Sequence, residues 1–470
     1  MRIGCSILLG AAALALSLVA SASASQGAVR ITPCASTEYT ASIGDAPAQT
    51  PTQSPDQLTI VLVGDTGFNP KGAEVDPRGF KKNGKEIGFA ESVSGVASDI
   101  NGDLAFVNLE TVITDRDDLE PDGKGQTSPY NFKSHPAGLR ALLNTGFNLF
   151  SLANNHSMDY GPLGVEETLY HLAVAGAEHP IAYAGIGTNY EEATRPGCLE
   201  LGDMKLGFSA TGIVTGQREE HRAGQNKAGQ AAYRNPKDFQ LVLNRLAELP
   251  ADYRILSIHY GLEGRVVPDK RQLTDWRGKA AQGRGIDLIV GHHPHVAQGV
   301  ERVGNSLIFY GLGNFLHPGT AEMKRFGVCR DYGLMAKVHL AKQDGDWRLG
   351  AIEAVPLTGT HMKPERFSPQ QSATRIHALN HLGARLGDGG TAQGVLFTPR
   401  SDGSGLYCSD DANALGGKIG AICKGYQPAP ATPASIARQL ASACADKPFY
   451  GAGKKKRKRW QRRRSGFERR

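Results

Sequence analysis

Cysteine, tryptophan and methionine are scarce in this chain, with 7, 3 and 6 copies among 470 residues. The cysteines are widely spaced, which is unlike the close spacing of a zinc-binding cysteine cluster. After residues 3–20, no stretch is apolar over the roughly 20 residues that a membrane-spanning helix needs. The composition therefore excludes a protein built from several membrane-spanning helices. Hydrophobic content of 40% is enough for a large globular core.

The single long apolar run lies at the start of the chain. Arg2 precedes it, and Ala22-Ser23-Ala24 provides the small-x-small pattern of a signal cleavage site. We therefore expect a signal peptide at residues 1–24 and a mature protein that is exported to the periplasm or the cell exterior. An uncleaved membrane anchor is the alternative. Because Cys5 precedes the apolar run, a lipoprotein signal is not supported.

Loss of Cys5 with the signal leaves an even number of cysteines, as expected for a disulfide-bonded exported protein. Six cysteines allow 15 pairings, which the sequence does not rank. Cys408 with Cys423 is the first pair to test, because both lie in a glycine-rich stretch. The six are Cys34, Cys198, Cys329, Cys408, Cys423 and Cys444.

The net charge of +7 comes from the end of the chain. Residues 454–470 hold 11 basic side chains and one acid, a local charge of +10, so the preceding residues carry about −3. Such a run is typical of a solvated tail. The functional alternatives are a clamp for a polyanion and a contact with an anionic membrane surface. An exported protein is not expected to bind nucleic acid.

Composition divides the chain into five parts. Residues 25–57 are rich in Ala, Thr, Ser and Pro and are interpreted as a linker. A main domain is expected at 58–357, followed by an irregular C-terminal extension at 358–450 and the basic tail at 451–470. Within the extension, residues 373–386 fit a helix and residues 387–428 are loop-like.

The main domain repeats a pattern of buried strand, polar turn and helix, which indicates an α/β fold. Buried or alternating runs predict strands at 58–63, 104–107, 147–152, 181–187, 198–210, 253–258, 287–290, 306–310, 332–340 and 347–356. Helices are predicted at 86–100, 135–144, 163–176, 236–249 and 272–282, with loops at 115–132 and 215–232.

Polar side chains follow the first two strands. Asp65 stands in GDTG directly after one strand, and Asn108 and Glu110 stand in NLE after the next. Ligands in open α/β folds bind at the carboxyl ends of strands. These three side chains are therefore candidate metal ligands. The alternative is capping or hydrogen bonding to nearby backbone.

The third strand ends in ANNHSMDYG. The amide oxygen of Asn155 is a candidate metal ligand, and the neighbouring His156 is a candidate proton donor. Asp159 is placed to orient the His156 ring. We therefore assign catalytic roles to His156 and Asp159.

Histidines follow two later strands. His259 stands in HYGLE, and DLIVGHHPH contributes His292, His293 and His295. Neutral imidazole is the commonest protein ligand for transition metals. All four are candidate metal ligands, although histidine-rich turns also occur on plain surfaces.

Glu263 of HYGLE and Asn314 of YGLGNF complete the candidate site as substrate-binding residues. The glycine-containing turn around Asn314 is expected to close the site.

The ordered motifs GDTG, NLE, ANNHSMDYG, HYGLE, GHHPHV and YGLGNF resemble the poly-gamma-glutamate capsule synthesis protein family, CapA. The resemblance covers about residues 58–316. It implies a calcineurin-like metallophosphoesterase fold, a four-layer α/β/β/α sandwich, in an exported protein of capsule-polymer synthesis or export. It also implies divalent metal, with manganese, zinc or iron as candidates. The implied partners are an anionic polymer such as poly-gamma-glutamate and membrane-bound capsule synthesis proteins.

Two positions depart from these patterns. Tyr260 stands where the family usually has tryptophan, and Gly67 stands where metallophosphoesterases have the histidine of an Asp-x-His motif. The first hypothesis is a metal-dependent hydrolase or transferase acting on an anionic substrate. The second is a non-catalytic polymer-binding or assembly protein on the same fold. Metal content distinguishes them.

Overall fold

The computed structural model describes residues 31–34, 56–213, 219–320, 326–430 and 432–446. The expected signal peptide and basic tail lie outside the described residues, as does most of the expected linker. Two large β-sheets dominate the described chain, and each combines parallel with antiparallel pairs.

The first sheet has eight strands. Their spatial order is β1 (Ile31–Pro33), β11 (Gly197–Leu201), β12 (Met204–Gly212), β14 (Tyr253–His259), β15 (Leu288–His292), β17 (Ser306–Phe309), β16 (Val300–Val303) and β22 (Ala392–Gly394). The central pairs β12–β14, β14–β15 and β15–β17 are parallel, and the outer pairs are antiparallel.

The second sheet has ten strands. Its main order is β23 (Thr398–Pro399), β24 (Gly405–Cys408), β20 (Asp346–Thr358), β19 (Gly333–Gln343), β2 (Gln57–Thr66), β5 (Leu104–Leu109), β8 (Leu149–Ser151) and β9 (Ala182–Ala184). Two short strands join it, β18 (Asn314–Leu316) beside β2 and β21 (Glu365–Arg366) beside β20. Strands β2, β5, β8 and β9 are mutually parallel.

Three two-stranded ribbons complete the strands of the described residues. They pair β3 (Gly79–Lys82) with β4 (Lys85–Gly88), β6 (Val112–Ile113) with β7 (Lys133–Ser134), and β10 (Ile186–Gly187) with β13 (Gly229–Gln230).

The helices are short to medium in length. They are α1 (Phe89–Val93), η1 (Ser94–Asp99), α2 (Pro136–Thr145), α3 (Gly161–Gly176), α4 (Tyr190–Ala193), η2 (Glu219–His221), α5 (Pro236–Glu248), α6 (Lys270–Gln272), the π-helix η3 (Leu273–Gln282), α7 (Pro369–Gly383), η5 (Ala412–Leu415), α8 (Gly417–Cys423) and α9 (Ala434–Ala443).

The two sheets pack face to face around one apolar core. Alternation along β5 sends Leu104 and Phe106 into this core and Val107 to the outer face. Phe106 meets Phe208 of β12 there, with ring centroids 5.9 Å apart. The core contains side chains from both sheets. The two sheets are therefore the two inner layers of a sandwich.

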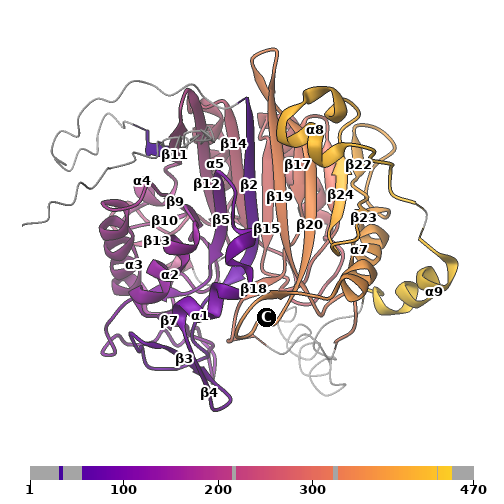
Figure 1. Ribbon diagram of the computed structural model, residues 1–470. Coiled ribbons are helices and arrows are strands. Elements are labelled where there is room, and N and C mark those ends of the chain that lie inside the picture. Colours follow the sequence, from indigo (N-terminus) through magenta and orange to yellow (C-terminus); the bar gives the residue numbers. More distant parts are fainter. Residues whose placement is uncertain (1–30, 35–55, 214–218, 321–325, 431, 447–470) are drawn as a thin grey trace, which may run out of the picture.

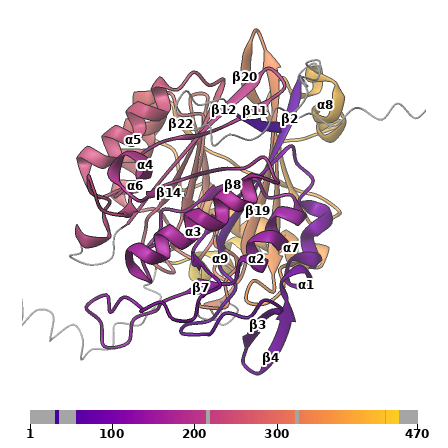
Figure 2. The ribbon, with the colours of Figure 1, turned by 90° about the vertical axis from the view of Figure 1, so that its left-hand side faces the viewer.

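Helices cover the outer faces. Side chains of α1, α2 and α3 pack on the second sheet, and those of α5 and η3 pack on the first. Figure 2 shows α1, α2 and α3 together, with the β3–β4 hairpin below them. In Figure 1, α7, α8 and α9 lie on the opposite side of the molecule from α3. The expected four-layer α/β/β/α sandwich is therefore confirmed.

Local sequence signals set several helix ends. The side chain of His135 accepts a hydrogen bond from Ala137 at the start of α2, and Gly146 ends that helix with φ of 111°. Asn235 caps α5 in the same way, and Pro236 occupies its first position, where a missing N–H costs nothing.

One predicted helix begins later than expected. The stretch 86–100 was expected to be helical throughout, but residues up to Gly88 form strand β4. Asn83 and Gly84, with φ of 51° and 79°, make the tight turn between β3 and β4. Asn-Gly is a strong signal for such a hairpin. The helix therefore begins only at Phe89.

The stretch at 387–428 is more regular than its glycine content suggests. It contributes β22 to the first sheet, and β23 and β24 to the second. Residues 31–33, inside the expected linker, likewise form β1 at the edge of the first sheet. Pairing with distant strands creates these elements, so local composition does not reveal them.

Three disulfides join the six cysteines of the described residues. They are Cys34–Cys198, Cys329–Cys444 and Cys408–Cys423. The expected Cys408–Cys423 pair is confirmed. Disulfides of this kind favour an oxidising, extracytoplasmic compartment. Within the described ranges, every helix is too short or too polar to cross a bilayer.

Candidate metal centre

The predicted site residues meet where parallel strands from both sheets end. Asp65 lies at the end of β2, Asn108 in β5, His259 at the end of β14 and His292 at the end of β15. The carboxyl ends of parallel strands share one edge of a sheet. Two sheets packed face to face therefore bring four such ends into one buried cluster.

Asp65 contacts histidines delivered by the other sheet. Its Oδ2 lies 3.0 Å from Nδ1 of His295, and its Oδ1 lies 3.5 Å from Nδ1 of His292. Asn108 donates its Nδ2 to Asp65 Oδ1 at 2.8 Å, which fixes the carboxylate. Asp65 is fully buried, so these contacts replace water around its charge.

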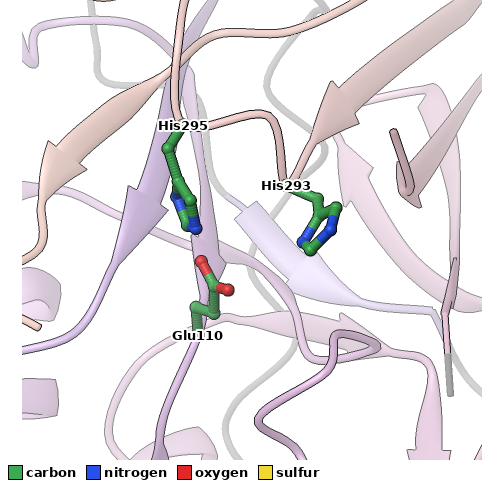
Figure 3. A group of neighbouring side chains, drawn as sticks. All are labelled: Glu110, His293 and His295. Atoms are coloured by element: carbon green, nitrogen blue, oxygen red, sulfur yellow. The ribbon is translucent and has the colours of Figure 1, made fainter. Parts of the chain in front are cut away.

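Glu110 lies at the centre of the histidine cluster. Its Oε1 is 3.4 Å from Nε2 of His259 and 3.8 Å from Nε2 of His156. Figure 3 shows its carboxylate pointing toward the His295 ring, with His293 beside them. One carboxylate thus faces imidazoles that come from several strand ends.

Potential ligand atoms form two overlapping groups here. Glu110, His293 and His295 place one ligand atom each within 4.8 Å of one another, and so do Asp65, Glu110 and His259. Glu110 belongs to both groups. A carboxylate with two oxygens can bridge two cations, as two-metal sites require.

The donor set fits a divalent cation. Both carboxylate oxygens of Glu110, Oδ1 of Asn108 and Nδ1 of His293 are buried and, within the described chain, have no hydrogen-bond partner. Leaving such atoms unpaired is costly unless something else satisfies them. Imidazole nitrogen with carboxylate and amide oxygen suits zinc, manganese and iron.

The turn that carries the histidines is strained. His293 and His295 have φ of 92° and 56°, in the left-handed region that residues with a Cβ rarely adopt. Pro294 separates them. Strain of this kind persists only where the surrounding structure enforces it, and it is concentrated at functional sites.

His156 belongs to a second buried network. Its Nδ1 lies 2.7 Å from Oδ2 of Asp159, as the sequence suggested, and Asp159 also accepts a hydrogen bond from Phe132 N at 2.6 Å. Lys124 forms a buried ion pair with Asp159 and lies 3.3 Å from Nδ1 of His156. Contact with Asp159 at Nδ1 leaves Nε2 directed toward Glu110.

Burial and nearby charge set the ionisation of the cluster. Burial lowers the pKa of His295, but the Glu110 and Asp65 carboxylates outweigh it and raise this pKa to about 10. Burial raises the pKa of Asp65, yet the nearby His292 and His295 imidazoles bring it well below its usual range. Burial, followed by the charge of Lys124, lowers the pKa of His156 well below 6.5. Asp65 and His295 thus form the charged pair of the cluster, while His156 stays neutral.

The amide candidates occupy different places. Asn155 accepts at Oδ1 from Nε2 of His259, at 2.7 Å. Asn314 lies beside Asp65 in the β18–β2 pair, and its Oδ1 is 2.9 Å from Nδ1 of His295. Asn155 thus lies beside another candidate ligand, His259, while Asn314 contacts His295.

Glu263 and His292 lie at the margins of the cluster. Glu263 is exposed, on the loop that follows β14, and its charge reaches His293 and His295. His292 faces the core between the sheets and stacks on Phe106 at 5.3 Å between ring centroids. It neighbours Asp65 without joining either ligand group.

The structure adds three residues that the sequence analysis missed. His317 lies 3.5 Å from Oε2 of Glu110, Lys124 pairs with Asp159, and Phe132 packs against His156 with ring centroids 4.4 Å apart. Lys124 and Phe132 come from the 115–132 loop. The polar sequence of this loop does not indicate that these two side chains point toward the site. His317 directly follows strand β18, which has only three residues and gives no periodic signal in the sequence.

A third group of potential ligands lies elsewhere. It comprises Asp115, Glu167 and His171, on and beside α3, and is more exposed.

The layers and the strand-end cluster define a four-layer α/β/β/α sandwich with a candidate metal centre. A family model described as "Bacterial capsule synthesis protein PGA_cap" matches residues 59–318, more than half of the chain. The chain belongs to this family of bacterial capsule synthesis proteins.

Individual relatives are distant. The chain is 27% identical over 221 residues to "PGA biosynthesis protein CapA" of Bacillus subtilis, which covers 46% of this chain and 53% of that protein. It is 31% identical over 185 residues to "Capsule biosynthesis protein CapA" of Bacillus anthracis, covering 38% and 42%. The chain thus spans about half the length of these two relatives.

Other relatives match over a longer stretch. "Probable polyglutamine synthesis accessory protein MT0602" of Mycobacterium tuberculosis is 23% identical over 381 residues, 71% of this chain and 93% of that protein. Among solved structures, TT1561 of Thermus thermophilus aligns over 59% of this chain and 93% of its own, with 13% identity and a TM-score of 0.30. PhoD aligns over 66% and 67%, with 9% identity and a TM-score of 0.28.

Proposed function

We propose that this protein is an exported factor of capsule-polymer synthesis or release, and that its strand-end cluster is a metal-dependent hydrolase or transferase site. The substrate is an anionic polymer or precursor of the poly-gamma-glutamate type. The position of Glu110 in both ligand groups, with neither of its oxygens hydrogen-bonded among the described residues, is the observation that carries this proposal.

Seven side chains would hold the cation or cations. They are Asp65, Asn108, Glu110, Asn155, His259, His293 and His295. A divalent cation there supplies Lewis acidity toward a phosphoryl or carbonyl oxygen. Zinc, manganese and iron all suit this mixture of nitrogen and oxygen donors.

His156 moves the proton. Asp159 holds Nδ1, so Nε2 is the atom that exchanges a proton with the substrate or its leaving group. Burial raises the pKa of Asp159 to about 7, and the charge of Lys124 opposes that rise. Phe132 packs on the His156 ring and limits its rotation.

The rim of the site carries charge of both signs. Arg234 is exposed and its guanidinium lies over the Tyr260 ring, 5.4 Å from the centroid. Its charge reaches His293 and contributes to lowering that residue's pKa, after burial and His295. An arginine held in this way suits a carboxylate or phosphate of the substrate.

The test combines metal content with turnover. Wild-type protein, loaded with zinc, manganese or iron in turn, is expected to retain stoichiometric metal and to act on gamma-linked glutamate polymers or phosphate esters. H156A should keep the metal and lose turnover, whereas H293A should lose both. Retained turnover in both variants, with folding intact, would refute the catalytic role.

A second candidate function is binding without catalysis. Gly67 occupies the position of a histidine in the enzymes this chain resembles, which removes one imidazole from the expected ligand set. In that case the protein would bind or present an anionic polymer to membrane-bound synthesis proteins. Absence of metal from wild-type protein after loading, combined with polymer binding, favours this candidate.

The basic tail at 454–470, outside the described residues, provides a counter-charge in either case. If the tail contacts the polymer or an anionic vesicle, binding should weaken as the salt concentration is raised. Deletion of residues 454–470 should remove that salt dependence. Binding that is unchanged by the deletion and by salt would exclude the tail as a contact.

A further inference from the structure

His317 lies where the chain compensates for the glycine at position 67. Strand β18 runs parallel beside the end of β2, with Asn314 opposite Asp65. The N–H of Gly67 donates to the carbonyl of Leu316 at 2.8 Å. The next residue after Leu316 is His317, so the residue just after the end of β18 brings an imidazole beside the position that lacks one.

The His317 ring is buried and has unsatisfied polar atoms. Its residue is 1% exposed, and neither Nδ1 nor Nε2 has a hydrogen-bond partner among the described residues. Nε2 lies 3.5 Å from Oε2 of Glu110, the oxygen that does not face His259. A buried imidazole with both nitrogens unpaired is uncommon unless a bound group completes it.

The neighbours of His317 hold its ring in place. Phe132 meets it edge to face at 5.2 Å between ring centroids, and His295 meets it at 5.5 Å in the same manner. The backbone N–H of His317 donates to Thr360 O at 2.7 Å. Ring contacts on two sides and an anchored backbone preorganise Nε2 toward Glu110.

We infer that His317 is a metal ligand of this centre, and that it replaces the imidazole missing at Gly67. It shares with Glu110 a cation of the imidazole-binding type, such as zinc, manganese or iron. This inference rests on the proposed metal centre. In this interpretation, the imidazole absent at Gly67 is supplied by the residue that follows β18, and the centre keeps its number of imidazoles.

The test replaces the ring without removing its bulk. H317F keeps an aromatic ring against Phe132 and removes both nitrogens, and H381F, on α7, is the matched control. Metal per chain and dissociation constants are measured by elemental mass spectrometry and competition with a chelator. Thermal unfolding of the metal-free proteins checks folding. A weakening of about tenfold or more, or loss of one equivalent, is expected in H317F alone.

X-ray absorption at the metal edge supplies a second readout. The number of imidazole scatterers should fall by one in H317F and stay constant in H381F. Unchanged affinity and unchanged imidazole count in H317F would overturn the inference while leaving the proposed centre intact. Wild-type protein that takes up no metal would overturn both.

Discussion

The Nδ1 atom of His295 lies 3.0 Å from Oδ2 of Asp65, although Asp65 is in β2 of one sheet and His295 is in the turn after β15 of the other. The pair connects the first motif that supplies candidate ligands, GDTG, with the last one, DLIVGHHPH. The carboxylate keeps His295 protonated when no cation is present, since it helps to raise the pKa of His295 to about 10. A cation that binds His295 would have to displace this proton, so the proposed metal binding would be coupled to the ionisation of the pair.

Replacement of Asp65 by asparagine should weaken metal binding by at least about tenfold, because a carboxylate ligand becomes a neutral amide of the same shape. Calorimetric titration with manganese or zinc measures the change. Circular dichroism of the metal-free variant serves as the folding control. Equal affinity in D65N and wild type would remove Asp65 from the ligand set.

Lys124 should be essential for stability. Its side chain is 3% exposed and that of Asp159 is 0% exposed, so K124M leaves a buried carboxylate without its counter-ion. We expect a loss of about 3–5 kcal/mol in the free energy of unfolding. Urea unfolding measures it, and K124M/D159N should recover part of the loss.

The exposed pair of Arg348 and Asp346, 3.5 Å apart, is the matched control for Lys124. R348M should cost less than about 1 kcal/mol, because water screens both charges. Equal losses of unfolding free energy in K124M and R348M would show that burial does not make the Lys124–Asp159 pair more important for stability than an exposed pair.

Asp287 should make stability depend on pH. Burial raises its pKa from 3.8 to about 6, against hydrogen bonding to Arg254. The folded state thus binds this proton more tightly than the unfolded state does. Its contribution is fully present below about pH 4 and is lost as pH rises through about 6, a change of about 3 kcal/mol.

D287N lacks this titration. Relative to wild type, the variant should therefore gain stability between about pH 4 and pH 7, as measured by urea unfolding at both values. Asp252, an exposed carboxylate that also accepts a backbone hydrogen bond, is the control. A D287N difference that does not vary with pH would contradict the assignment.

The disulfides should differ in their effect on stability. Cys329 and Cys444 are 115 residues apart in sequence, and Cys408 and Cys423 are 15 apart. Loop-closure entropy predicts losses of about 4.7 and about 3 kcal/mol when each pair is changed to alanine. Urea unfolding of C329A/C444A beside C408A/C423A tests the order. A larger loss in the shorter loop would show that entropy does not dominate.

Arg234 should contribute to binding of an anionic substrate. Because its guanidinium stacks on Tyr260 at the rim, R234A should weaken binding of gamma-linked oligoglutamate several-fold at low salt. Fluorescence anisotropy of a labelled oligomer measures this, with R348A as a control remote from the site. Equal binding by both variants would place the polymer elsewhere.

Periodicity and strand-end position accounted for much of the site. Asp65, Asn108 and Glu110 were identifiable because each follows a buried run closely, and His259 because a strand delivers it. His317 follows a strand of only three residues, whose apolar content is too small to show a period. Lys124 could not be found in this way, because its inward direction depends on a loop folding over Asp159.

The limits of the fold prediction have similar causes. Asn83-Gly84 carried a local turn signal, yet the polar run around it concealed the hairpin. Strands β22 and β24 exist because β16 and β20 offer unpaired edges, and such pairing is absent from the local sequence.

Local chemistry along the chain was enough to predict the α/β alternation, the strand-end placement of the candidate ligands and the Cys408–Cys423 pair. Side-chain period and turn residues act over a few positions, so these features can be recognised without a structure. Three relations became visible only in the folded chain: Glu110 serves both ligand groups, His317 stands beside Gly67, and Lys124 meets Asp159. They depend on how two sheets and a loop pack together, and packing joins residues that are far apart in sequence.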